Sequence, residues 1–148
     1  MLVEIDHIGI VAHTWAEARE VLVDKLGLVL DSKRSPEPDG VYFAPERTNN
    51  YFVKVGLGKT RVEVLIPVDT TSGTARFLAR EGPGLHHIGY ACSDVGEEAE
   101  RLELAGLRRI DLGPVQEGRR LGAAFFHPKS VNGILTELVP VYQEPASG

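Results

Sequence analysis

The stretch "IDHIGIVA" (residues 5–12) recurs 80 residues later as "LHHIGYAC" (residues 85–92), and this recurrence is the main evidence for the fold. Each copy is followed by an acidic run, "AEAREVLVDKLGL" from Ala16 and "GEEAERLELAGL" from Gly96, with apolar residues at spacings of three and four. Such spacing predicts a helix in each half, and the glycine near the end of each run suits a helix C-cap. The chain is therefore expected to contain two similar modules.

Each half also closes in a similar way. "RVEVLIP" (residues 61–67) matches "ILTELVP" (residues 134–140), and the match pairs Glu63 with Glu137. Both are short, β-rich runs ended by proline, which favours strands. The preceding runs "NYFVKVGL" and "GAAFFHP" predict the first strand of a hairpin in each half. The repeat unit is thus a strand, a helix, and then two or three strands.

The repeat predicts one α+β domain over residues 1–148 made of two tandem βαβββ modules, at about residues 1–70 and 83–143. Residues 71–82 are expected to form a linker with a short helix, ended by Gly82-Pro83-Gly84. Residues 31–50, rich in Pro, Asp and Asn, are interpreted as a long loop that contains one short strand.

Composition narrows the classes of function. Of 148 residues, 43% are hydrophobic and 25% charged, and the net charge of -5 without a basic run argues against nucleic-acid binding. Cys92 is the only cysteine, so no intramolecular disulfide can form. No stretch reaches the ~18 to 20 apolar residues of a membrane span. A cytoplasmic location and a small-molecule ligand are the expectations.

The repeat indicates which histidines are candidate metal ligands, because it aligns His87, and not His86, with His7. With Glu63 and Glu137 they make a set of two imidazoles and two carboxylates, which suits a divalent ion such as Zn, Ni, Co, Mn or Fe. A single His or Glu in a strand is more often a packing or surface residue. Recurrence at matching positions of both halves favours a metal site, whereas His86 is expected to be a packing or surface neighbour.

Two other residues, Cys92 and His13, are not expected to belong to a functional site. Cys92 matches Ala12 in the repeat and nothing orients a histidine toward it, so a cysteine nucleophile is rejected. His13 has no counterpart in the second half and is expected to be a packing or surface residue.

The pattern resembles the vicinal oxygen chelate superfamily, which includes glyoxalase I, extradiol dioxygenases and methylmalonyl-CoA epimerase. The resemblance is closest to the epimerases, in "IDHIGIV", "RVEVLIP", "FLAREGPGLHHIGY" and "FFHPKSVNGILTEL". It implies a curved mixed sheet around a metal cleft, with His7, Glu63, His87 and Glu137 as ligands of one divalent ion. Two further metal positions would receive the thioester carbonyl and the carboxylate of the substrate.

The resemblance also implies a reaction. A metal-dependent epimerase would act on methylmalonyl-CoA or a similar 2-substituted malonyl thioester through a metal-stabilised enolate. Glu137 is a candidate base. The second glutamate of many bacterial epimerases falls here on Phe43 or Phe52, depending on the direction of counting, and leaves Glu46 as a candidate of uncertain alignment.

The phrase "HPKS" opens the last hairpin. His127, Lys129 and Ser130 could hold a substrate carboxylate or thioester tail, or could simply form a turn. The two interpretations stay open.

Alternative functions remain at this stage. They are a glyoxalase I-type isomerase or lyase, an Fe(II) oxygenase on the same scaffold, and a metal-free binding protein. Glu137 as a fourth ligand argues against an oxygenase, which prefers two histidines and one carboxylate. The resemblance implies an acyl-CoA-type substrate and a homodimer.

Overall fold

A computed structural model describes residues 1–111, 116–117, 120–144 and 146. The chain divides into two compact units, one of residues 7–87 and the other of residues 1–6 with 88–148. They are called the first and the second unit below. Among the described residues, no helix is both long and apolar enough to cross a membrane.

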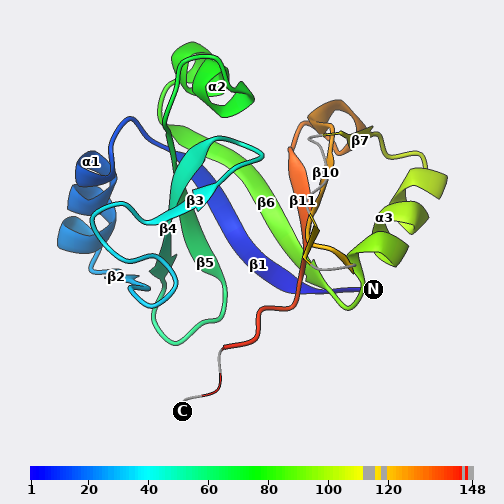
Figure 1. The fold of residues 1–148 in the computed structure, drawn as a ribbon, viewed down its shortest axis with the longest axis horizontal. Helices are drawn as coiled ribbons and strands as arrows, with labels where there is room; N and C mark the ends of the chain where they lie inside the picture. The colour runs from blue at the N-terminus through cyan, green and yellow to red at the C-terminus, as the bar shows by residue number, and fades with distance from the viewer. Residues whose placement is uncertain (112–115, 118–119, 145, 147–148) are drawn as a thin grey trace. The chain divides into compact units, whose positions relative to one another are not determined.

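The first unit is built on four strands that follow the order β2-β4-β5-β1 (Figure 1). Strands β1 and β5 are parallel, whereas β4 is antiparallel to β5, β2 and β3. The elements of this part of the chain are β1 (Leu2–Val11), α1 (Trp15–Arg19), η1 (Glu20–Lys25), β2 (Val29–Leu30), β3 (Val41–Phe43), β4 (Thr48–Lys54), β5 (Arg61–Pro67) and α2 (Gly73–Glu81).

The second unit repeats this pairing in the order β6-β11-β10-β7. Strands β6 and β11 are parallel, and β10 is antiparallel to β11 and β7. Its elements are β6 (Gly84–Cys92), α3 (Val95–Leu104), β7 (Arg109–Ile110), β8 (Gln116–Glu117), β9 (Arg120–Leu121), β10 (Ala124–Phe126), η2 (Pro128–Ser130) and β11 (Thr136–Pro140). Strands β8 and β9 form a separate small sheet.

The predicted fold class is confirmed. Each unit contains the pattern of strand, helix and three strands, with both parallel and antiparallel pairs among its strands. The additions to the pattern are β3, which pairs with β4, and the β8-β9 hairpin.

Each unit packs its helix against one face of its own strands. In the first unit, Ala18 and Leu22 contact Tyr51, Val53 and Val64 in a buried cluster. In the second unit, Val95 and Ala99 of α3 lie in a cluster with Ala124, Phe126 and Leu138. The opposite face of β5 is left for Glu63, because successive strand residues alternate between faces.

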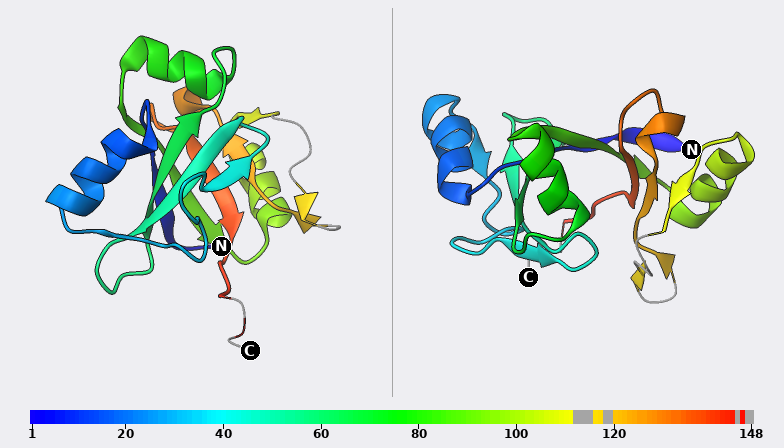
Figure 2. Two further views of the ribbon diagram at one scale, coloured as in Figure 1. Left: turned by 60° about the vertical axis from the view of Figure 1, so that its left-hand side comes forward. Right: turned by 90° about the horizontal axis from the view of Figure 1, so that it is seen from above.

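The helix predicted from Ala16 is not one α-helix. It changes from α to π hydrogen bonding at Glu20, so that the Leu26 amide donates to the Val21 carbonyl at 2.9 Å. Figure 2 shows α1 and η1 as one continuous coil beside their strands. The glycines predicted as C-caps both have left-handed backbones, with φ of 77° at Gly27 and 98° at Gly106.

The loop predicted over residues 31–50 is shorter than expected, because its last residues, "TNN", belong to β4. Thr48 and Asn50 are polar but only 0% and 4% exposed. The Thr48 hydroxyl donates to Asn50 Oδ1 at 2.6 Å, so that the hydroxyl proton and the amide oxygen satisfy each other. Turn-like composition concealed a strand that is paired with β5 from its first residue.

The remaining loop is held to the sheet by Ser35, which is fully buried. Its hydroxyl oxygen accepts the Phe52 amide of β4 at 2.9 Å and its proton is donated to the Asp31 carbonyl at 3.0 Å. One side chain therefore satisfies a backbone donor of the sheet and a backbone acceptor of the loop.

Ser35→Ala should lower the free energy of unfolding by about 1–3 kcal/mol, because the buried Phe52 amide loses its acceptor. Urea denaturation followed by circular dichroism would measure the change. Ser32→Ala, at an exposed position of the same loop, is the control and should change stability by less than ~0.5 kcal/mol. Equal stability of the two variants would contradict this role of Ser35.

Candidate metal centre

Strand register brings the predicted ligands together in the same way in both halves. In the parallel pair β1-β5, Glu63 lies opposite Gly9, which is two residues after His7. In the parallel pair β6-β11, Glu137 lies opposite Gly89, which is two residues after His87. The sequence repeat is therefore also a repeat of hydrogen-bond register, and each half presents an imidazole and a carboxylate on neighbouring strands.

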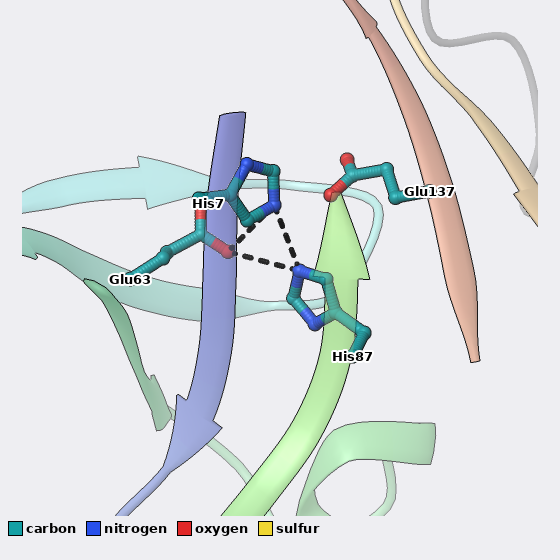
Figure 3. A group of neighbouring side chains, drawn as sticks. All are labelled: His7, Glu63, His87 and Glu137. Atoms are coloured by element: carbon teal, nitrogen blue, oxygen red, sulfur yellow. Dashed lines mark hydrogen bonds and ion pairs between the residues drawn. The ribbon is translucent and has the colours of Figure 1, made fainter. Parts of the chain in front are cut away.

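Three of these side chains converge within the first unit (Figure 3). The Nε2 atoms of His7 and His87 are 3.0 Å apart. Glu63 Oε1 lies 3.4 Å from His87 Nε2 and 3.8 Å from His7 Nε2. The three residues are 2%, 1% and 7% exposed, so their polar atoms are nearly withdrawn from bulk water.

Glu137 completes the predicted set and is 6% exposed. One ligand atom from each of His7, Glu63, His87 and Glu137 lies within 4.8 Å of the others. The structure thus brings together all four residues that the repeat had selected.

The spacing and chemistry of this cluster fit a divalent cation. Ligands about 2.1 Å from one ion are about 3.0 Å apart at right angles and about 3.4 Å apart in a tetrahedron. The observed separations of 3.0, 3.4 and 3.8 Å lie close to these values. Two buried carboxylates also call for positive charge, because an unbalanced buried charge is costly. Nitrogen and oxygen donors suit Zn, Ni, Co, Mn or Fe.

Gly9 makes room for the ring of His87, a role that the sequence analysis did not assign. A Cβ atom at this position would overlap the Cε1, Nδ1 and Nε2 atoms of His87. The ring therefore lies directly against the β1 backbone. A signal was present in the sequence, since "HIG" occurs in both copies of the repeat.

His86 lies outside the cluster of four candidate ligands but touches one of them. Its Nδ1 atom lies 2.8 Å from Nδ1 of His87, within hydrogen-bond distance. On its other side the ring meets Phe77 of α2 edge-on, with centroids 4.8 Å apart. His86 is half-buried, so the expectation of a packing neighbour holds, with the addition of a polar contact to the metal-site histidine.

The candidates for the second base occupy different surroundings. Glu46 follows β3 and is 8% exposed. Phe52 pairs with Glu63 across β4 and β5, so that the two side chains share a face of the sheet. The guanidinium of Arg34 lies 3.8 Å from the centre of the Phe52 ring. Sequence reasoning missed this cation, which comes from the loop before β3.

The "HPKS" residues form a capped turn. The Ser130 hydroxyl accepts the Arg108 amide at 3.0 Å and donates to the His127 carbonyl at 2.8 Å. His127 Nδ1 accepts the Lys129 amide at 3.1 Å, while the Lys129 side chain is exposed. Turn chemistry accounts for these contacts of Ser130 and His127.

Cys92 has the surroundings of a core residue. It is fully buried, and its thiol donates to the Val139 carbonyl at 3.6 Å. Burial raises the pKa of the Cys92 thiol, which disfavours the reactive thiolate. The rejection of a cysteine nucleophile agrees with this environment.

Gly9→Ala should displace His87 and weaken binding of a divalent ion by at least about tenfold, as when a ligand's support is disturbed. Isothermal titration with Zn or Co would measure the affinity, and His87→Ala marks the effect of losing the ligand itself. Gly73→Ala is the control, because a Cβ there meets nothing within 4 Å. Wild-type affinity in Gly9→Ala would show that His87 does not need this space.

Comparisons with known proteins agree with the architecture. The sequence profile of the Glyoxalase/Bleomycin resistance protein/Dioxygenase superfamily matches residues 6–125. The uncharacterized protein YqjC of Bacillus subtilis is 30% identical over 134 residues, which cover 90% of this chain and 89% of that protein. An ethylmalonyl-CoA/methylmalonyl-CoA epimerase of Cereibacter sphaeroides is 36% identical over 89 residues, which cover 59% of this chain and 66% of that enzyme.

A solved structure is also similar to this chain in fold. A variant of the Streptomyces coelicolor methylmalonyl-CoA epimerase, in complex with 2-nitronate-propionyl-CoA, matches with a TM-score of 0.80 and 26% identity. The match covers 97% of this chain and 100% of that one. The matched profile, the repeated βαβββ pattern and the buried cluster of two histidines and two glutamates agree with one another. The chain belongs to the glyoxalase/bleomycin resistance protein/dioxygenase superfamily, also called the vicinal oxygen chelate superfamily.

Proposed function

We propose that this protein is a metal-dependent epimerase of methylmalonyl-CoA or a similar 2-substituted malonyl thioester. The observation that carries the proposal is the buried cluster of His7, Glu63, His87 and Glu137. The epimerases among its relatives support the choice of substrate, since one is named for ethylmalonyl-CoA and methylmalonyl-CoA and another is in complex with an acyl-CoA ligand. A homodimer, as the resemblance implies, is part of the proposal.

In this proposal the four clustered residues hold one divalent ion. When bound, the ion supplies Lewis acidity that stabilises negative charge developing on a carbonyl oxygen of the substrate. The protein contributes burial, because less than a tenth of each of the four residues is exposed. Charge interactions at such a site are stronger than in water.

Epimerisation needs a proton to leave one face of the α-carbon and another to arrive on the opposite face. We assign these transfers to Glu46 and to Glu137, which would act as a base by loosening from the metal; both are buried carboxylates. His127, Lys129 and Ser130 are proposed to hold the substrate carboxylate or thioester tail. The exposed ammonium group of Lys129 is the group of this turn best suited to an anion.

The proposal is tested by the exchange of the α-proton of methylmalonyl-CoA in deuterium oxide. The metal-loaded protein should incorporate deuterium and interconvert the two epimers, and removal of the metal by a chelator should abolish both. Mass spectrometry reports the exchange, and a stereospecific coupled assay reports the inversion. Absence of exchange together with turnover of a glutathione hemithioacetal would replace this function with a glyoxalase I-type isomerisation.

The assignment of Glu46 makes a sharper prediction. Glu46→Gln should slow epimerisation by about 10²–10⁴-fold, the usual contribution of a positioned base. One epimer should still exchange its α-proton with retention through Glu137, and metal affinity should be unchanged. Glu17→Gln on α1, where the side chain is exposed, is the control. Normal epimerisation by Glu46→Gln would remove Glu46 from the mechanism.

A further inference from the structure

We propose that His86 is a positioning residue that selects the tautomer in which His87 can bind a metal. The inference rests on the proposed metal centre and assigns a role to a residue outside the ligand set. The observation that carries it is the 2.8 Å contact between the Nδ1 atoms of the two neighbouring imidazoles.

Two ring nitrogens at this distance share one proton. In a neutral imidazole one nitrogen donates and the other accepts, so either His87 donates to His86 or His86 donates to His87. Each neutral ring carries a single N–H proton, so the donor has its proton on Nδ1 and the acceptor has its proton on Nε2.

Only one of the two arrangements suits a ligand. His87 Nε2 faces His7 Nε2 at 3.0 Å and Glu63 Oε1 at 3.4 Å, so Nε2 is the atom that would meet the ion. Its lone pair is available when the His87 proton is on Nδ1 and is donated to His86. If His86 were the donor, the His87 proton would lie on Nε2 and would have to leave before a metal could bind.

The residues around His86 hold its ring where it can accept the Nδ1 proton of His87. The edge of the ring faces Phe77 at an interplanar angle of 86° and a centroid distance of 4.8 Å. Phe77 belongs to α2, the helix that precedes β6, and Arg80 of the same helix lies over its ring at 5.7 Å. His87 is limited on its own side by the backbone of Gly9.

Metal sites of other proteins contain a comparable contact. Metal-binding histidines nearly always donate their second ring N–H to a carboxylate, a backbone carbonyl or water, and this outer contact fixes the ring and the tautomer. Here the acceptor is the imidazole of the preceding residue. Strand alternation alone would direct adjacent side chains to opposite faces, so the contact was not predictable from the sequence.

The first test is made on the metal-free protein labelled with ¹⁵N at histidine, at about pH 8, where imidazoles are ordinarily neutral. Long-range ¹H–¹⁵N correlation spectra distinguish the two tautomers. His87 is expected to carry its proton on Nδ1 in the wild-type protein. The proton on Nε2 of His87 would overturn the inference, whether or not the protein proves to be an epimerase.

The second test measures metal affinity by isothermal titration with Zn or Co. His86→Phe keeps a flat ring against Phe77 but removes the acceptor, and should weaken binding by about 10–100-fold. His86→Asn places an amide oxygen near the position of Nδ1 and should restore affinity to within about threefold of wild type. His13→Phe, at an exposed histidine, is the matched control and should bind as wild type.

The outcomes separate this inference from the function on which it rests. Wild-type protein that binds metal but does not epimerise would refute the proposed reaction and leave the role of His86 intact. Equal affinities of wild type and His86→Phe, in proteins with the same circular dichroism, would refute the role of His86. Failure of His86→Asn to recover affinity would also refute it, because the acceptor would then not be what His86 supplies.

Discussion

Two buried carboxylates and two buried imidazoles, with ligand atoms within 4.8 Å of one another, form the constraint on which this structure depends. Carboxylates so placed repel each other unless a positive charge lies among them. The strands, the glycine on β1 and the packing of the rings all serve to hold these groups near the spacing of metal ligands. The proposed chemistry follows from the same constraint, since the charge that balances the carboxylates can also stabilise a developing oxyanion.

Pairing between parallel strands is the means by which the chain builds this site. A parallel pair needs a crossover, and in each unit the crossover contains the helix that covers one face of the strands. The other face is then available for the carboxylate of the closing strand. Because the offset between histidine and glutamate partner is two residues in both halves, one repeated register yields a ligand pair twice.

Neighbouring groups contact the candidate ligands in ways that single-residue motifs do not indicate. The ring of His87 lies between the backbone of Gly9 and the imidazole of His86, and His86 in turn contacts Phe77. The helix α2, expected only as part of a linker, thus contributes a side chain that contacts a neighbour of the candidate metal centre. Such outer contacts commonly change metal affinity by 10–100-fold.

The duplicated local pattern was enough to predict two modules, the strands that open and close them, and the candidate ligands His7, Glu63, His87 and Glu137. The sequence could not determine that "TNN" begins β4, because polar Thr48 and Asn50 are typical of a loop and their hydrogen bond to each other forms only in the folded sheet. Nor could it show that His86 touches His87 or that Gly9 makes space for the ring. Those facts depend on how strands and rings approach in space, which local spacing does not encode.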